Sequence, residues 1–325
     1  MYPTVSNNLS SRINGSIEAI TAFESLTPQV ERLIERFGHD EVALLQKVAD
    51  LQLELDAAKQ ELRLLHSRDE AIDTQMRLMD EELRLAARLQ GDFLPKTLPR
   101  IGPVRFHALY RPANYVSGDL YDVTRLTERH VGFYMADAVG HGVPAALLAM
   151  FIKNALVTKE ILPEKGYRLL DPSESLGRLN NTLIDQNLEH ATFATAIYGH
   201  VDVSTLQVTL SRAGHPHPII LRADGSVATL ETEGSLLGIF PDETYCSVTT
   251  QLAPGDKMVL YTDGMEVAFK DGDAMDSAEW IKELQNRSSL GGAELVASIA
   301  DHINATGGSL APKDDVTLVV MEVER

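Results

Sequence analysis

Residues 130–150 read HVGFYMADAVGHGVPAALLAM and contain the clearest structural pattern in the chain. The apolar run HVGFYMAD has the length and composition of a strand and ends in Asp137. Gly140 and Gly142 follow at once and permit a tight backbone turn. Pro144 then opens an apolar helix, because proline suits the first helical turn. The stretch therefore predicts a carboxylate held at a strand end, beside a tight turn and a helix.

The same kinds of segment recur along the rest of the chain from residue 100. Period-two apolar patterns predict further strands at 106–111, 120–126, 192–201, 205–213, 217–223, 257–263 and 315–323. Helical patterns occur near 173–187, 277–286 and 293–304. Strand clusters separated by helix pairs lack the regular βαβ alternation of a doubly wound fold. They predict an α+β domain, with two packed sheets covered by helices.

Several more aspartates stand where predicted strands start or end: Asp119, Asp122, Asp263, Asp314 and Asp315. Strand ends on neighbouring strands converge, so these side chains and Asp137 can surround one point. Carboxylates share a pocket only when protons or cations neutralise them. Oxygen ligands without cysteine favour Mg²⁺ or Mn²⁺ over zinc. For any one aspartate a turn cap or a solvated loop acid is the simpler reading, and the recurrence at strand ends favours a metal site.

The N-terminal part has a different, helical pattern. Residues 1–28 are polar without a steady period and are predicted to be flexible. Residues 29–95 carry apolar residues in alternating steps of four and three, as in a coiled coil, with no proline from residue 30 to residue 94. A parallel two-stranded coil would make the protein a homodimer. The alternatives are a helix folded back on the next domain and an intramolecular hairpin.

Composition limits the class of protein. The 325 residues suffice for one large domain or two ordinary ones, and a net charge of −18 disfavours a nucleic-acid binder. No apolar run reaches the roughly 20 residues of a membrane span, and the N-terminus lacks a signal-peptide layout. Cys246 is the single cysteine, so no intramolecular disulfide can form. These features favour a cytoplasmic protein without a membrane segment.

A series of motifs resembles the SpoIIE/RsbU branch of the PPM metal-dependent phosphatases. The resemblance runs from about residue 83 to the C-terminus, and the lead-in helix ELRLAARLQGDFLPKTLP also looks like that of the family. The motifs appear in the family's order: SGDLYD, DAVGHGVPAALLAM, AGHPHPIIL, LLGI, PGDKMVLYTDG and KDDVTLVV.

The resemblance implies a β-sandwich flanked by helices over residues 100–325, with two Mn²⁺ or Mg²⁺ ions. By motif, Asp137 is expected to bridge both ions and Ala138 to offer its backbone carbonyl. Asp263 and Asp314 are expected to bind the ion that Ala138 does not, and Asp119 to help hold the second ion directly or through water. Ala138 replaces a common glycine, a change that keeps the carbonyl ligand.

The implied activity is hydrolysis of phosphoserine or phosphothreonine on a partner protein. The expected substrate is a STAS-domain anti-sigma-factor antagonist, as is common in this family. His141 beside the turn is either a structural residue or a general acid for the leaving oxygen. The N-terminal helix is expected to dimerise the chain and to receive a signal from an upstream regulatory protein. A shift of residues 83–94 would then move the turn 137–142.

Two other functions fit parts of the sequence. A catalytically inactive coiled-coil scaffold that binds a phosphoprotein would have no need for four mutually repelling aspartates. An ATP-binding kinase of the histidine-kinase type would need an Asn-bearing helix and a second glycine box, and neither pattern is visible. The sequence therefore favours the phosphatase.

Overall fold

The structure is a computed structural model that describes residues 28, 32, 35, 41–162, 166–187, 192–269, 277–306 and 312–325. The chain divides into two compact units, Met1–Glu82 and Leu83–Arg325. The predicted flexible segment 1–28 lies, Pro28 apart, outside the described residues. The division into domains at residues 28, 95 and 100 stays a prediction.

Helix α3 is the one long helix of the described N-terminal part and runs over Glu41–Phe93. It is continuous for 53 residues, as expected for a segment without proline. Pro95 follows it and cannot continue a helix. The prediction of a long N-terminal helix is therefore confirmed, whereas its pairing as a coiled coil is not tested. Among the described residues, no helix is both long and apolar enough to cross a membrane.

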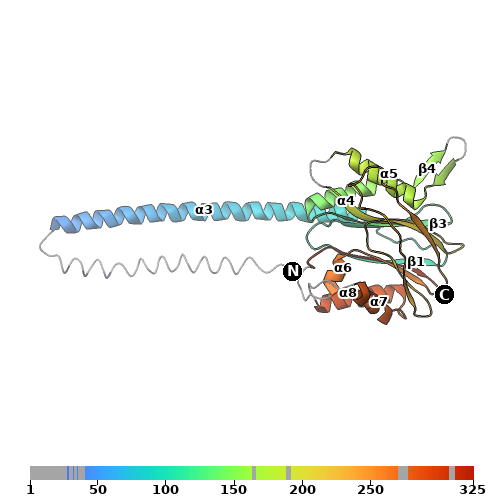
Figure 1. Cartoon of the computed structure of the whole chain (residues 1–325). Coiled ribbons are helices and arrows are strands. Elements are labelled where there is room, and N and C mark those ends of the chain that lie inside the picture. Colours follow the sequence, from blue (N-terminus) through green and yellow to red (C-terminus); the bar gives the residue numbers. More distant parts are fainter. Residues whose placement is uncertain are drawn as a thin grey trace. The chain divides into compact units, whose positions relative to one another are not determined.

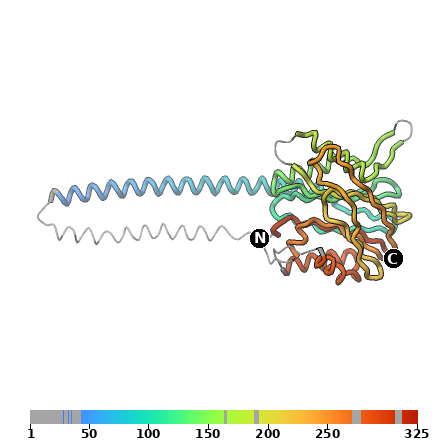
Figure 2. Tube along the Cα trace, in the orientation of Figure 1, coloured from blue at the N-terminus to red at the C-terminus, as the bar shows by residue number. Residues whose placement is uncertain are grey.

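The second unit contains two five-stranded sheets, in which the strand pairs are antiparallel (Figure 1). The first sheet, in spatial order, consists of β1 (Val104–Arg111), β12 (Val316–Val323), β11 (Lys257–Tyr261), β8 (Ile219–Leu221) and β9 (Val227–Thr229). The second consists of β10 (Ser247–Gln251), β7 (Gln207–Ala213), β6 (Ala194–Asp202), β3 (His130–Ala138) and β2 (Asp119–Arg125). The trace in Figure 2 shows the C-terminal strand beside the strand that opens the domain, and these two pair from Val104↔Val323 to Arg111↔Val316.

Helices cover the outer faces of both sheets. The second sheet packs against α4 (Val143–Ala155) and α5 (Pro172–Asp185), and the first against α6 (Gly264–Phe269), α7 (Ser277–Asn286) and α8 (Gly292–Thr306) (Figure 1). A small hairpin of β4 (Lys159–Leu162) and β5 (Gly166–Leu169) stands apart. Pro144 lies in the first turn of α4, and Asp171 caps α5 by accepting a hydrogen bond from the Ser173 amide.

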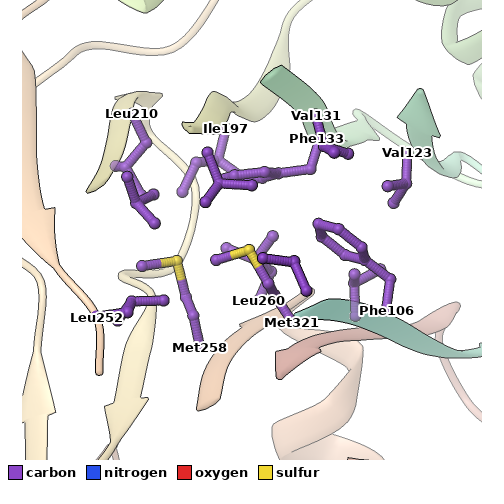
Figure 3. Close-up of a cluster of buried hydrophobic side chains, with 14 of the residues drawn as sticks. Phe106, Val123, Val131, Phe133, Ile197, Leu210, Leu252, Met258, Leu260 and Met321 are labelled. Atoms are coloured by element: carbon purple, nitrogen blue, oxygen red, sulfur yellow. The ribbon is translucent and has the colours of Figure 1, made fainter. Parts of the chain in front are cut away.

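The main core lies between the two sheets (Figure 3). Phe106, Leu260 and Met321 from the first sheet face Phe133 and Ile197 from the second, and all five are nearly inaccessible. Burial of this apolar surface on both inner faces is the main force that joins the sheets. The predicted α+β sandwich flanked by helices is confirmed.

Candidate metal centre

The candidate site lies where the core between the sheets ends. Side chains alternate along a strand, so every second residue shares one face. In β3 the core residue Met135 is followed two places later by Asp137, and in β11 Leu260 is followed by Thr262. Asp119 stands at the start of β2, directly opposite Asp137. The inner faces of the sandwich therefore change from apolar to polar at one end, and this change creates the site.

Asp119 is the buried member of the site, with only 1% of its surface exposed. One carboxylate oxygen accepts hydrogen bonds from Thr262 Oγ1 at 2.7 Å and from Thr317 Oγ1 at 2.6 Å. Thr317 lies in β12 of the opposite sheet and Thr262 directly follows β11 of that sheet, so Asp119 joins the two sheets. Burial, followed by repulsion from Asp137, raises the pKa of Asp119 well above its usual range.

Asp137 is half-buried beside the turn that follows β3. Burial raises its pKa to about 7, with additional repulsion from Asp263, Asp314 and Asp315. The charged neighbours that shift this pKa are thus all carboxylates. A carboxyl group in such surroundings is fully charged at neutral pH only when a cation compensates its charge.

Asp263 and Asp314 form the exposed rim of the site. Partial burial and repulsion from Asp263 raise the pKa of Asp314, while a hydrogen bond from the Asp315 amide and the nearby His141 oppose this shift. Gly264 allows the two segments to meet, since a Cβ there would lie 2.0 Å from the Asp315 carbonyl oxygen. The structure therefore brings together Asp119, Asp137, Asp263 and Asp314, which are distant in sequence.

Asp315 has a structural role next to the rim. Its side chain accepts hydrogen bonds from the backbone amides of Ala113 at 2.7 Å and Gly118 at 2.8 Å. It is 6% exposed, so both bonds are shielded from water. Asp315 thus fixes the loop that leads into Asp119.

Ala138 packs closely against the same loop. Its amide donates to the Gly118 carbonyl at 3.1 Å, and a Cβ at Gly118 would lie 2.8 Å from the Ala138 carbonyl oxygen. Gly140 and Gly142 have φ values of 89° and 74°, in the region that favours glycine. The backbone around Ala138 is therefore held by close contacts on one side and by glycine turns on the other.

Gln90 connects the end of α3 to this loop. Its side-chain amide donates to the Ser117 carbonyl at 2.7 Å and its oxygen accepts from the Ser117 amide at 3.0 Å. Sequence reasoning missed Gln90, Thr262 and Thr317. Thr262 and Thr317 stand in motifs that were noticed for their aspartates, and no local pattern marks Gln90.

The donor chemistry of the site fits a hard divalent cation. Its side-chain donors are carboxylate oxygens, which suit Mg²⁺ or Mn²⁺, and their mutual repulsion calls for positive charge. Among the described residues, no three His, Cys, Asp or Glu side chains already stand in a metal-binding arrangement. Ligation by Asp119, Asp137, Ala138, Asp263 and Asp314 stays a prediction.

Comparisons with known proteins agree on one family. A family model described as Stage II sporulation protein E (SpoIIE) matches residues 127–324. The chain is 30% identical over 241 residues to the phosphoserine phosphatase RsbU of Bacillus subtilis, covering 74% of this chain and 69% of the relative. It is 27% identical to the phosphoserine phosphatase RsbP of the same organism, covering 57% of this chain and 45% of that relative.

A solved structure supports the fold. The SiaA-PP2C domain of Pseudomonas aeruginosa superimposes with a TM-score of 0.64 at 23% identity, covering 76% of this chain and 98% of that domain. The family of these proteins depends on divalent metal ions, which agrees with the oxygen donors described above. From the family match and the similarity to RsbU, the chain belongs to the SpoIIE/RsbU branch of the PPM-type serine/threonine protein phosphatases.

Proposed function

We propose that this phosphatase removes phosphate from serine or threonine of a STAS-domain anti-sigma-factor antagonist, within a cytoplasmic partner-switching pathway. The environment of Asp137 supports a working catalytic site. Its charged neighbours are carboxylates, and it lies opposite the buried Asp119. The names of RsbU and RsbP support phosphoserine as the reacting group. The STAS-domain substrate rests on the family resemblance of the motifs.

The site would hold two Mn²⁺ or Mg²⁺ ions through Asp119, Asp137, Asp263, Asp314 and the Ala138 carbonyl. When bound, such ions lower the pKa of a water molecule, so that it can attack phosphorus. The protein's own contribution is to keep the carboxylates in place. Thr262 and Thr317 hold one oxygen of Asp119, and Asp315 holds the loop before it. This rigidity reduces the reorganisation needed during reaction.

Hydrolysis of p-nitrophenyl phosphate tests the catalytic part of the proposal. We expect turnover that requires Mn²⁺ or Mg²⁺ and is abolished in Asp137→Ala. Asp224→Asn is the matched control, because Asp224 is an exposed turn residue that bonds to Ser226. Turnover that persists in Asp137→Ala, or that needs no divalent ion, would contradict the proposal. Phosphorylated STAS-domain proteins, assayed with and without Mn²⁺, then test the substrate class.

We further propose that α3 dimerises the chain as a coiled coil and carries a signal from an upstream regulatory protein. Five residues of the heptad pattern lie exposed on the single chain, as expected if a second helix covers them: Leu62, Leu65, Ile72, Met76 and Met79. At the other end of α3, Gln90 bonds to Ser117, two residues before Asp119. A change in packing at the end of α3 can therefore reach the site through these two hydrogen bonds and the short backbone segment from Ser117 to Asp119.

Deletion of residues 1–80 tests the regulatory proposal. The deletion is expected to convert a dimer into a monomer and to change the specific activity. Light scattering and the phosphatase assay measure the two effects. A truncated protein that stays dimeric with unchanged activity would contradict both parts.

A further inference from the structure

A cavity of about 370 Å³ lies next to the candidate metal centre. This volume is within the ~300–1,000 Å³ range of ligand pockets. Its lining includes Arg212, His215, His217 and Thr195, together with Asp263 from the rim of the site. Arg212 directly precedes the motif AGHPHPIIL.

Arg212 is a cation whose hydrogen bonds to described residues go to backbone carbonyls and not to a carboxylate. Its guanidinium donates from Nε to the Thr232 carbonyl at 3.0 Å and from Nη1 to the His215 carbonyl at 2.6 Å. Neither contact neutralises its charge, and within the described part of the chain it forms no ion pair with a carboxylate. Partial burial also lowers its pKa. A partly desolvated guanidinium with donors left over is suited to bind an anion.

The neighbouring histidines are uncharged and so add no positive charge that would also bind the anion. His215 is 1% exposed, and burial followed by the charge of Arg212 lowers its pKa to about 3. Its Nδ1 lies 2.8 Å from Thr195 Oγ1. His217 Nδ1 is buried and has no hydrogen-bond partner among the described residues. Arg212 is therefore the one positive group of the described cavity lining, with neutral polar groups beside it and two carboxylates, Asp263 and Glu266, elsewhere in the lining.

Strand register connects this cavity to the metal centre. Across the second sheet, Asp119 of β2 lies opposite Asp137 of β3, and Asp137 lies opposite Thr195 of β6. Neighbouring strands are about 4.8 Å apart, and directly opposite residues share a face. Thr195 thus lies next to Asp137 and also lines the cavity. Asp263 lines the same cavity from the first sheet.

We propose that the Arg212 cavity is an anion-binding subsite that positions the phosphoprotein substrate beside the metal centre. Its ligand is an anionic oxygen group of that substrate, either the phosphoryl group itself or a carboxylate close to the phosphoserine. The proposal rests on the phosphatase function proposed above. Arg212 acts here as a substrate-binding residue, and the neutral histidines shape the cavity around it.

Substrate kinetics with Mn²⁺ test the subsite in the full chain. The substrates are p-nitrophenyl phosphate and two phosphoserine peptides, one with aspartates beside the phosphoserine and one with asparagines there. Arg212→Gln is expected to raise KM for the acidic peptide roughly tenfold, with little change in kcat. An equal rise for p-nitrophenyl phosphate identifies the phosphoryl group as the ligand. A rise confined to the acidic peptide identifies the flanking carboxylate.

Three further variants control for charge and folding. Arg129→Gln removes a cation that lies just before β3, at the opposite end of the strand from Asp137. Because Arg129 forms an ion pair with Asp202, this change should leave KM unchanged. Glu266→Gln removes a negative charge from the cavity lining and should lower KM. Arg212→Lys keeps the positive charge and should retain most of the affinity. Unchanged KM values in Arg212→Gln, with normal thermal unfolding, would overturn the subsite.

A binding measurement separates the subsite from the catalytic proposal. Fluorescence anisotropy of the labelled acidic phosphopeptide needs no turnover. Weaker binding to Arg212→Gln than to the unaltered protein supports the subsite even if no hydrolysis occurs, and in that case only the catalytic proposal fails. Equal binding to both proteins would overturn the subsite irrespective of activity.

Discussion

Asp314 and Asp315 are neighbours in sequence with opposite environments. Asp314 is exposed and repelled by Asp263, whereas Asp315 is buried and accepts two backbone amide bonds. One residue is therefore available to a metal ion, while the other maintains the loop before Asp119. The two identical side chains can therefore serve different roles, because successive residues at a strand end face opposite sides.

Asp315→Ala is expected to destabilise the protein by about 2–4 kcal/mol, because the amides of Ala113 and Gly118 would lose their acceptors in a buried place. Asp315→Asn keeps one acceptor oxygen and should have a smaller effect. Asp314→Asn should leave the stability of the metal-free protein unchanged or higher, since it removes repulsion. Urea unfolding measures all three. Equal midpoints for Asp315→Ala and the unaltered protein would contradict this role.

At the scale of elements, the end of α3 is tied to the catalytic unit through Gln90. Gln90→Leu keeps the approximate volume but leaves the amide and carbonyl of Ser117 without their side-chain partner. A loss of about 2–4 kcal/mol in unfolding free energy is expected, together with weaker Mn²⁺ binding. Gln90→Glu retains the acceptor and should lose less. Calorimetric titration with Mn²⁺ measures the metal affinity, and urea unfolding measures the stability. If Gln90→Leu equals the unaltered protein in both quantities, the Gln90–Ser117 contact does not stabilise the site.

Strong local patterns allowed most elements to be predicted from sequence. β3 and β12 are apolar and long, and α4 begins at Val143 with Pro144 in its first turn, as expected. β10 was missed because SVTTQ is a polar strand at the edge of a sheet, where little burial constrains the sequence. Helix α6 was missed because it is six residues long and starts at a glycine.

The site shows the same division between local and tertiary information. Aspartates at strand ends were visible because a charge next to an apolar run is a local signal. Thr262 and Thr317 were not, because their importance depends on two sheets meeting over Asp119. Arg212 was missed for the same reason, since only the folded chain places it beside Asp263 and Thr195.

At the scale of the whole molecule, stability should depend on pH and metal together. The pKa of Asp137 is raised to about 7 in the folded state, whereas an unfolded aspartate has a pKa of ~3.9. Between these values the folded protein holds more protons than the unfolded chain. This group therefore stabilises the metal-free protein at low pH, and its contribution is lost as pH rises toward 7.

Divalent ions should reverse this loss, because they replace the proton as the neutralising charge. At about 100 times its Kd, Mn²⁺ is expected to raise Tm by roughly 5–10 °C at pH 7.5 and by less at pH 5.5. In Asp137→Asn both the Mn²⁺ effect and the pH dependence of the metal-free Tm should shrink. Calorimetry over this pH range measures the effect. A Tm rise with Mn²⁺ that is equal at both pH values would contradict the assignment.

The pairing of β1 with β12 has a consequence for biosynthesis. β1 has one neighbour in its sheet, and that strand is made more than 200 residues later. While a ribosome is still translating the intervening chain, β1 presents an open edge and Asp119 lacks the hydroxyl of Thr317. Catalytic competence is therefore expected only after translation has passed β12, and a nascent chain arrested earlier leaves both edges of β1 unpaired, which favours aggregation.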